Sequence, residues 1–116
     1  MNKRITLTIA LLSLMAAGPA AATGDAAAGK AKAEAICKGC HGADGNSTNP
    51  QYPRLAGQYA SYIRKALHDY QSGRRKNPIM KGFAASLSDQ DIDNLAAYFS
   101  TQKGLHTPVL PRRVDQ

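Results

Sequence analysis

Two cysteines and a histidine lie close together in the first half of the chain, and their spacing points to one kind of chemistry. The segment reads Cys37-Lys38-Gly39-Cys40-His41, so two thiols three positions apart are followed at once by an imidazole. This pattern is the attachment signature of a c-type haem, whose two vinyl groups form thioethers with the two thiols. The imidazole suits the fifth coordination position of the iron. We therefore predict one haem c, bound covalently by Cys37 and Cys40, with His41 as a ligand of its iron.

Three other interpretations of these residues stay open on the sequence alone. A zinc site normally needs four protein ligands, but the chain has only two cysteines, and His68 and His106 are not spaced as a zinc pair. A thioredoxin-like redox pair lies at a strand-to-helix turn, and no convincing strand pattern occurs nearby. A structural disulfide is compatible with an oxidising compartment but gives no reason for His41. Haem accounts for more of the motif than any of these.

A second protein ligand to the iron has to come from elsewhere in the chain. Met80 follows Asn77 and Pro78 in a segment that we expect to be irregular, and it is the only methionine after residue 22. A methionine thioether commonly faces histidine across a c-type haem, where it raises the reduction potential. An isolated methionine is more often core filler, and His68 and His106 are competing ligands. We predict Met80 as the second ligand.

The remaining ring N–H of a metal-bound histidine normally donates to an acceptor nearby. Pro53 lies in irregular chain after the haem motif, and a proline carbonyl can accept although its nitrogen cannot donate. We predict that the carbonyl of Pro53 accepts a hydrogen bond from Nδ1 of His41.

The first residues resemble an export signal in composition. Lys3 and Arg4 precede an apolar run over residues 5–17, and alanines at positions 20 and 22 form a small-residue cleavage site. The run is shorter than the about 20 residues that span a membrane, although an uncleaved anchor is the alternative. We predict a signal peptide at residues 1–22, one domain at 23–104 and a tail at 105–116. The mature protein would be periplasmic and would have no stable membrane span.

The charge of the chain is strongly positive. Fifteen Lys and Arg residues stand against eight Asp and Glu, giving a formal net charge of +7. Nucleic acid is the usual partner of such a chain, but export and the scarcity of aromatic residues beside the basic ones argue against it. A basic face for an acidic redox partner fits better.

Three segments have helical patterns, and they cover residues 26–36, 58–72 and 87–103. Asp25 and Ser88 suit the N-cap positions of the first and last segments. Gly73 suits the C-terminal end of the middle segment.

These residues together resemble a class I c-type cytochrome of the small bacterial monohaem kind, and one half of a bacterial dihaem cytochrome c. Gly29 stands where the family has its helix-crossing glycine, and residues 95–98 match the C-terminal helix that packs against it. Pro53 and Leu55 match the Pro-x-Leu of the haem site, and Met80 follows in the family's order. The resemblance implies an all-α class I cytochrome c fold. In that fold three to four helices wrap one covalent haem c, and the N- and C-terminal helices cross. Ala33 departs from the pattern, because many relatives have an aromatic residue there, which predicts a thinner helix contact.

The resemblance implies an electron carrier and not an enzyme. One electron would move on a His/Met-ligated haem between redox partner proteins with acidic docking faces. Basic residues near the haem-contacting segments would steer such partners; they are Lys38, Arg54, Arg74, Arg75, Lys76 and Lys81. One alternative is a dedicated cytochrome subunit of a periplasmic dehydrogenase or sulfur-oxidising complex. Another is a haem sensor or enzyme with an open iron site.

Overall fold

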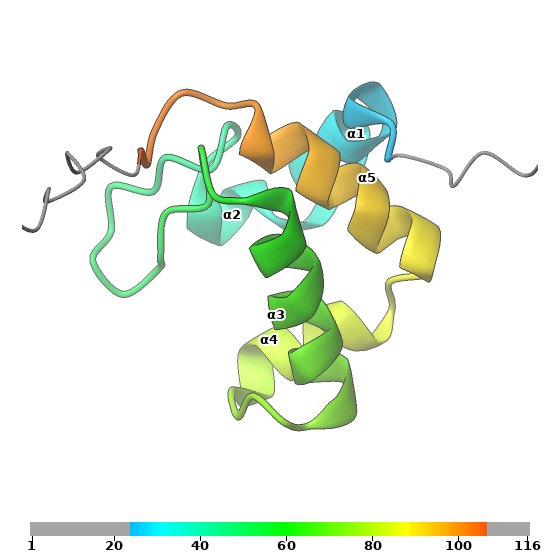
Figure 1. Ribbon diagram of the computed structural model, residues 1–116. Coiled ribbons are helices and arrows are strands. Elements are labelled where there is room, and N and C mark those ends of the chain that lie inside the picture. Colours follow the sequence, from blue (N-terminus) through cyan, green and yellow to red (C-terminus); the bar gives the residue numbers. More distant parts are fainter. Residues whose placement is uncertain (1–23, 107–116) are drawn as a thin grey trace, which may run out of the picture.

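The computed structural model describes residues 24–106, and within that range it contains helices and no strand (Figure 1). The helices are α1 (Ala26–Ile36), α2 (Lys38–His41), α3 (Ala60–Ser72), α4 (Pro78–Ala85) and α5 (Asp89–Ser100). The all-α prediction is therefore confirmed, with five helices in place of three to four. The predicted signal peptide at residues 1–22 and most of the predicted tail lie outside the described residues. None of the described helices is long and apolar enough to cross a membrane.

Local capping fixes the helix ends that the sequence predicted best. The Asp25 carboxylate accepts from the backbone N–H groups of Ala27 and Ala28, which otherwise lack partners in the first turn of α1. Ser88 and Asp91 form a reciprocal capping box at the start of α5. Gly73 closes α3 in the left-handed conformation with φ 77°, where residues with a Cβ are strained.

Helix α4 was not expected, because Met80 was placed in irregular chain. The Asn77 side chain accepts from the backbone N–H of Met80 at 3.0 Å, and Pro78 occupies the first helical turn. An N-cap asparagine followed by proline is a recognised helix start. The segment is short, so its apolar residues show too few turns for a clear period.

Helices α1 and α5, which are far apart in the sequence, cross in direct contact (Figure 1). A Cβ on Gly29 would lie 2.0 Å from the Asn94 carbonyl oxygen and 2.9 Å from the Tyr98 Cβ. Only glycine permits this approach of the two backbones. Ala33 is fully buried one turn further along α1, where a larger side chain would also force the helices apart.

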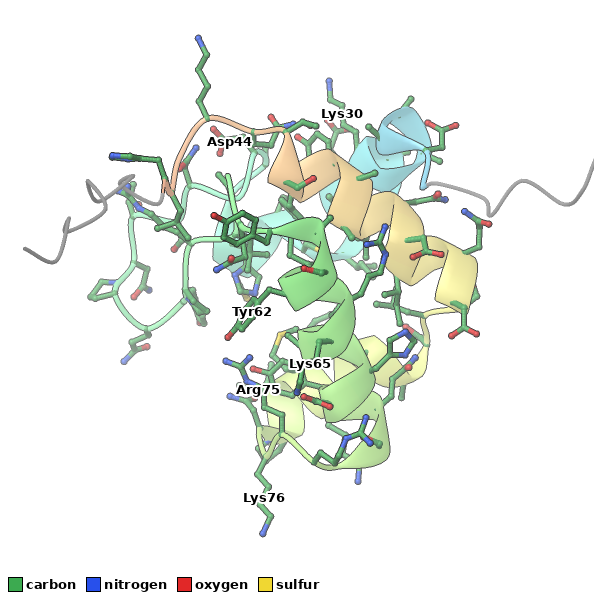
Figure 2. The ribbon with its side chains drawn as sticks, viewed as in Figure 1. Lys30, Asp44, Tyr62, Lys65, Arg75 and Lys76 are labelled. Atoms are coloured by element: carbon green, nitrogen blue, oxygen red, sulfur yellow. The ribbon has the colours of Figure 1, made fainter. Side chains whose placement is uncertain are left out.

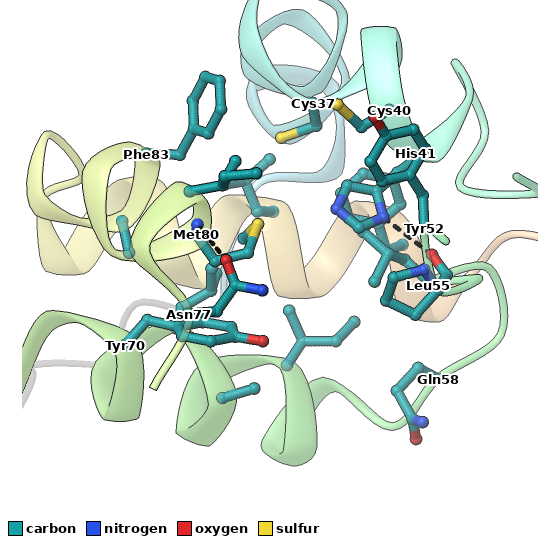
Figure 3. Close-up of a pocket in the computed structure, with 18 of the residues that line it drawn as sticks. Cys37, Cys40, His41, Tyr52, Leu55, Gln58, Tyr70, Asn77, Met80 and Phe83 are labelled. Atoms are coloured by element: carbon teal, nitrogen blue, oxygen red, sulfur yellow. Dashed lines mark hydrogen bonds between the residues drawn. The ribbon is translucent and has the colours of Figure 1, made fainter. Parts of the chain in front are cut away.

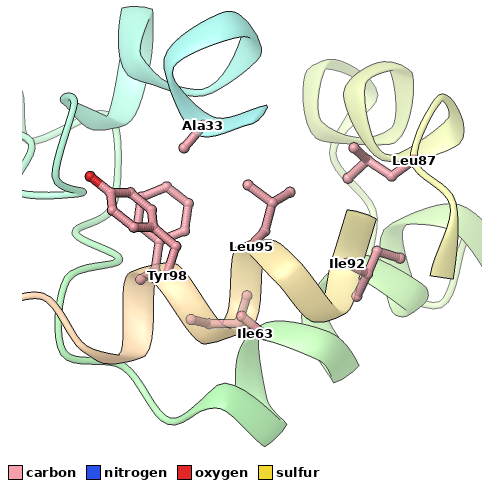
Figure 4. Packing of buried hydrophobic residues seen from close by; sticks show 8 residues of the cluster. Ala33, Ile63, Leu87, Ile92, Leu95 and Tyr98 are labelled. Atoms are coloured by element: carbon pink, nitrogen blue, oxygen red, sulfur yellow. The ribbon is translucent and has the colours of Figure 1, made fainter. Parts of the chain in front are cut away.

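The core is centred on α5 (Figure 4). That helix contributes Ile92, Leu95, Ala96, Tyr98 and Phe99. The largest side chains with almost no exposed surface are Phe99, Ile92 and Leu95. From the other elements, Ala33 joins from α1, Ile63 from α3 and Leu87 from the loop before α5. Helix α5 is therefore the element against which the others are positioned.

Helix α5 ends earlier than the 87–103 pattern predicted. After Ser100 the chain turns, and the Lys103 carbonyl accepts from the Asn46 amide at 2.8 Å. The Leu105 N–H donates to the Ala56 carbonyl at 2.7 Å. These hydrogen bonds to distant loop residues form where the predicted helix would have continued. The local sequence could not indicate them.

Candidate haem site

The haem motif lies on one short turn of helix that continues from α1. Cys37 caps the C-terminal end of α1 and the N-terminal end of α2, and the His41 N–H donates to the Cys37 carbonyl at 3.0 Å. Both cysteines are half-buried, whereas His41 is only 7 % exposed. Figure 3 shows both sulfur atoms at one edge of a cavity and the His41 ring on the wall next to that edge. The three groups are therefore placed to bind one ligand together.

Pro53 accepts a hydrogen bond from His41, as its carbonyl oxygen lies 2.8 Å from the imidazole Nδ1 (Figure 3). A carbonyl can only accept, so Nδ1 carries the hydrogen and Nε2 keeps its lone pair free for a metal. The loop that presents Pro53 is held by the Gly45 carbonyl, which accepts from the N–H groups of Leu55 and Ala56 at 2.8 and 3.2 Å. Backbone bonds thus fix the orientation of the imidazole.

Met80 lies on α4, on the wall opposite His41 (Figure 3). Its thioether and the free edge of the imidazole point into the cavity from opposite sides. The cap from Asn77 sets the start of α4 and so the direction in which Met80 leaves the backbone. Two metal ligands of different type therefore face each other across one space.

The cavity between them has a volume of about 500 Å³, within the roughly 300–1,000 Å³ typical of cofactor sites. Its walls are mainly apolar. The apolar lining residues include Leu55, Ile63, Leu67, Phe83, Leu87 and Leu95. An apolar cavity with two thiols on one edge and His and Met on opposite faces fits a haem, which is large, flat and mostly apolar.

Two arginines supply positive charge at this mainly apolar cavity. Arg75 donates to the Tyr62 hydroxyl at 3.2 Å (Figure 2). Its guanidinium lies 5.0 Å from the centre of the Tyr70 ring. The bond to Tyr62 raises the pKa of Arg75 above its ordinary value, so the group stays cationic. Arg54 also lines the cavity and is anchored by donating to the Ser47 carbonyl. Both charges suit the carboxylate groups that a haem carries.

The Cys37 thiol is held in its protonated form by its surroundings. Burial, together with the nearby Cys40, raises the pKa of Cys37 to about 11. A protonated thiol is a weak nucleophile. The motif lies between two helices and not at the strand-to-helix turn of a thioredoxin-like pair, which disfavours that interpretation.

The competing ligands lie elsewhere. His68 is on α3 and does not line the cavity; its Nδ1 is 3.2 Å from the Gln71 Oε1. His106 is exposed and does not line the cavity either. The tyrosines of the predicted 58–72 helix differ in their surroundings. Tyr62 and Tyr70 on α3 line the cavity, whereas Tyr59, just before α3, is 63 % exposed. The helical period in the sequence shows which side of α3 is apolar, but it cannot show whether that side faces the cavity or the protein core.

Comparison with known proteins places this site in a family. The sequence model described as "Cytochrome c" matches residues 26–103. Cytochrome c4 of Pseudomonas aeruginosa is 52 % identical over 103 residues, which is 89 % of this chain and 50 % of the relative. Cytochrome c-554(548) of Halomonas halodenitrificans is 45 % identical over 83 residues, covering 69 % of this chain and 99 % of the relative. The chain belongs to the cytochrome c family.

Solved structures agree with this assignment. The crystal structure of reduced recombinant cytochrome c4 from Pseudomonas stutzeri matches with a TM-score of 0.66 and 47 % identity, over 71 % of this chain and 47 % of that one. A further relative by sequence, a thiosulfate dehydrogenase electron acceptor of Stutzerimonas stutzeri, is 52 % identical over 62 residues, covering 53 % of this chain and 29 % of the relative. The chain thus spans about half the length of the cytochrome c4 relatives it matches. The fold is that of class I cytochromes c, and the cofactor of the chain is haem c with its iron.

Proposed function

We propose that this protein carries single electrons between redox proteins. Cys37 and Cys40 would hold the haem covalently, and His41 and Met80 would bind its iron from opposite sides. The observation that carries the proposal is the placement of the imidazole and the thioether on facing walls of one apolar cavity. Bound haem supplies a one-electron ferric–ferrous couple whose potential depends on its axial ligands and burial.

The protein's own contribution would be to keep both ligands in place and to exclude water. The bond from His41 to the Pro53 carbonyl fixes the imidazole and increases its basicity as a ligand. Leu55 contributes to the apolar wall beside it. With two protein ligands bound, no coordination position would be left for a substrate, which favours a carrier over an enzyme or a gas sensor.

The spectrum of the haem-loaded ferric protein tests the proposed ligands. We expect a weak far-red charge-transfer band from methionine-to-iron coordination, and we expect Met80→Ala to abolish it. Carbon monoxide should bind the reduced variant readily and the reduced wild type poorly, because only the variant has an open position. A wild-type protein without the band, or with rapid carbon monoxide binding, would contradict the Met80 assignment and favour a sensor or an enzyme.

We further propose that redox partners with acidic faces dock on the basic side chains near the haem motif and α4. Lys38, Lys76 and Lys81 are exposed, and Lys76 projects into solvent (Figure 2). Charge steering of this kind weakens as salt screens it. A Lys38→Gln/Lys81→Gln variant should slow electron transfer to an acidic partner by about threefold at low salt.

The matched control is Lys30→Gln/Lys103→Gln, which removes the same charge from other exposed positions. The control should change the rate much less. Rates that do not change between low and high salt would contradict the docking proposal while leaving electron carriage itself intact.

A role as a dedicated subunit of a larger enzyme is the second candidate. Similarity to a thiosulfate dehydrogenase electron acceptor favours it. Purification from the native source distinguishes the two, since a subunit would copurify with a partner in fixed ratio and a free carrier would not. The carrier would be periplasmic if residues 1–22 act as a signal peptide, and mass spectrometry of the mature N-terminus tests this.

A further inference from the structure

Helix α4, which carries Met80, has few apolar contacts with other helices. It packs mainly against α3 among the described elements, and Ala84 is its only buried residue. Its larger apolar side chains, Ile79 and Phe83, line the cavity and are 62 % and 42 % exposed. An isolated helix of eight residues is not stable in water. Other contacts must therefore hold α4 in position.

Gln71 on α3 supplies such a contact. Its side-chain Nε2 donates to the carbonyl oxygens of Ala84 and Leu87, each at 2.9 Å. The Ala84 carbonyl also accepts from the Leu87 N–H at 3.1 Å, but only the Gln71 bond ties this end of α4 to another helix. One amide group thus joins α3 both to the C-terminal end of α4 and to the segment that leads into α5.

The orientation of this amide is itself fixed. The Gln71 Oε1 lies 3.2 Å from Nδ1 of His68, which can donate to it. With the oxygen turned towards His68, both hydrogens of the amide nitrogen are available for the two carbonyls. His68, considered above as an iron ligand, has a structural use here instead.

We propose that Gln71 is a positioning residue that holds α4 against α3 and so keeps Met80 at the iron. The inference rests on Met80 being the proposed ligand. Because the cavity lies on one side of α4 and the Gln71 bonds are at its C-terminal end, loss of those bonds frees the helix to move away from the cavity. Met80 would then leave the iron more often, while His41 and the thioethers stay in place.

The test is the binding of imidazole to the ferric haem-loaded protein, since imidazole can bind only when Met80 has left. Apparent affinity is proportional to the fraction of protein in the open form. Gln71→Leu removes both hydrogen bonds, and we expect about a tenfold increase in imidazole affinity. The far-red methionine-to-iron band should weaken in the same variant. Gln71→Glu keeps the length of the side chain but has no donor, so it should have the same effect.

Gln102→Leu is the matched control. The Gln102 Nε2 donates to the Tyr98 carbonyl near the C-terminal end of α5 at 3.0 Å, so the variant loses a bond of the same kind at another helix end. Its imidazole affinity should stay within about twofold of wild type, even if its unfolding free energy falls as much. A role of Gln71 in overall stability alone would lower the free energy of unfolding of its variants without raising their imidazole affinity above that of Gln102→Leu.

The outcomes separate the two proposals. If the wild type has the methionine band and Met80→Ala abolishes it, but both Gln71 variants bind imidazole like wild type or like Gln102→Leu, the positioning role is wrong and Met80 remains the ligand. If the wild type lacks the band and Met80→Ala leaves imidazole affinity unchanged, the ligand assignment fails and the positioning role fails with it.

Discussion

The crossing of α1 and α5 and the cavity wall formed by α3 and α4 are stabilised in different ways. At the crossing, backbones meet at Gly29, and buried side chains of α5 fill the space between the helices. The α3–α4 wall directs most of its apolar side chains into the cavity, and polar contacts such as those of Gln71 and Asp69 hold its parts together. We therefore expect the first region to depend on packing within the polypeptide and the second to depend on the cofactor.

Removing the haem attachment should affect the two regions unequally, and we expect it to have the largest effect. A Cys37→Ser/Cys40→Ser variant cannot form thioethers, and a domain this small has little apolar core of its own. We expect loss of most helical circular dichroism. Residual protection in amide hydrogen exchange should be confined to α1 and α5. Equal protection of α3 and α4 without haem would show that the comparison is wrong.

Adding a methyl group at the crossing of α1 and α5 should lower the free energy of unfolding, whereas adding one on α4 should not. Gly29→Ala would place Cβ 2.0 Å from the Asn94 carbonyl oxygen, and we expect a loss of about 2–3 kcal/mol in the free energy of unfolding from overpacking. Gly82→Ala is the control, because nothing lies within 4 Å of its Cβ. That variant should be neutral or more stable by up to about 1 kcal/mol, as alanine favours helix. Urea denaturation of both haem-loaded variants measures the difference.

The polar contacts of the α3–α4 wall should make its stability depend on pH, with a smaller effect. Asp69 pairs with Lys65 and with Arg74, and these bonds lower the pKa of its carboxyl group in the folded protein. A folded pKa below the unfolded value stabilises the fold above the unfolded pKa, and this contribution is lost as pH falls through the folded pKa. We therefore expect Asp69→Asn to be less stable than wild type at pH 7.

The same variant should lose less stability than wild type as the pH falls from about 4, the ordinary pKa of aspartate in an unfolded chain, towards the lower pKa of Asp69 in the folded protein. Urea denaturation at several pH values measures this. Asp89→Asn removes an equal charge in the first turn of α5 and serves as the control. An Asp69→Asn profile parallel to that of wild type would show that the ion pairs do not contribute to the stability of this wall.

The ends of α1 and α5 show how far local sequence could be used. The predicted range 26–36 matches α1, because Asp25 caps its first turn with a local bond. The start of α5 was equally clear from Ser88 and Asp91. The end of α5 was not clear, since the helix stops at Ser100 and the Lys103 carbonyl accepts from the Asn46 side chain in a distant loop. Helix ends fixed by neighbours in the sequence were predictable, and those fixed by distant loops were not.

The sequence by itself determined the chemistry of this protein, because covalent haem attachment requires two thiols and a histidine at fixed local spacing. It also indicated Pro53 and Met80 as partners of that site, since each is chemically suited to one role. Only the tertiary structure decided that Met80 lies on a helix facing His41, and that Gln71 joins that helix to α3. Such contacts join residues whose spacing in the chain carries no periodic signal, so they exist only once the helices have packed.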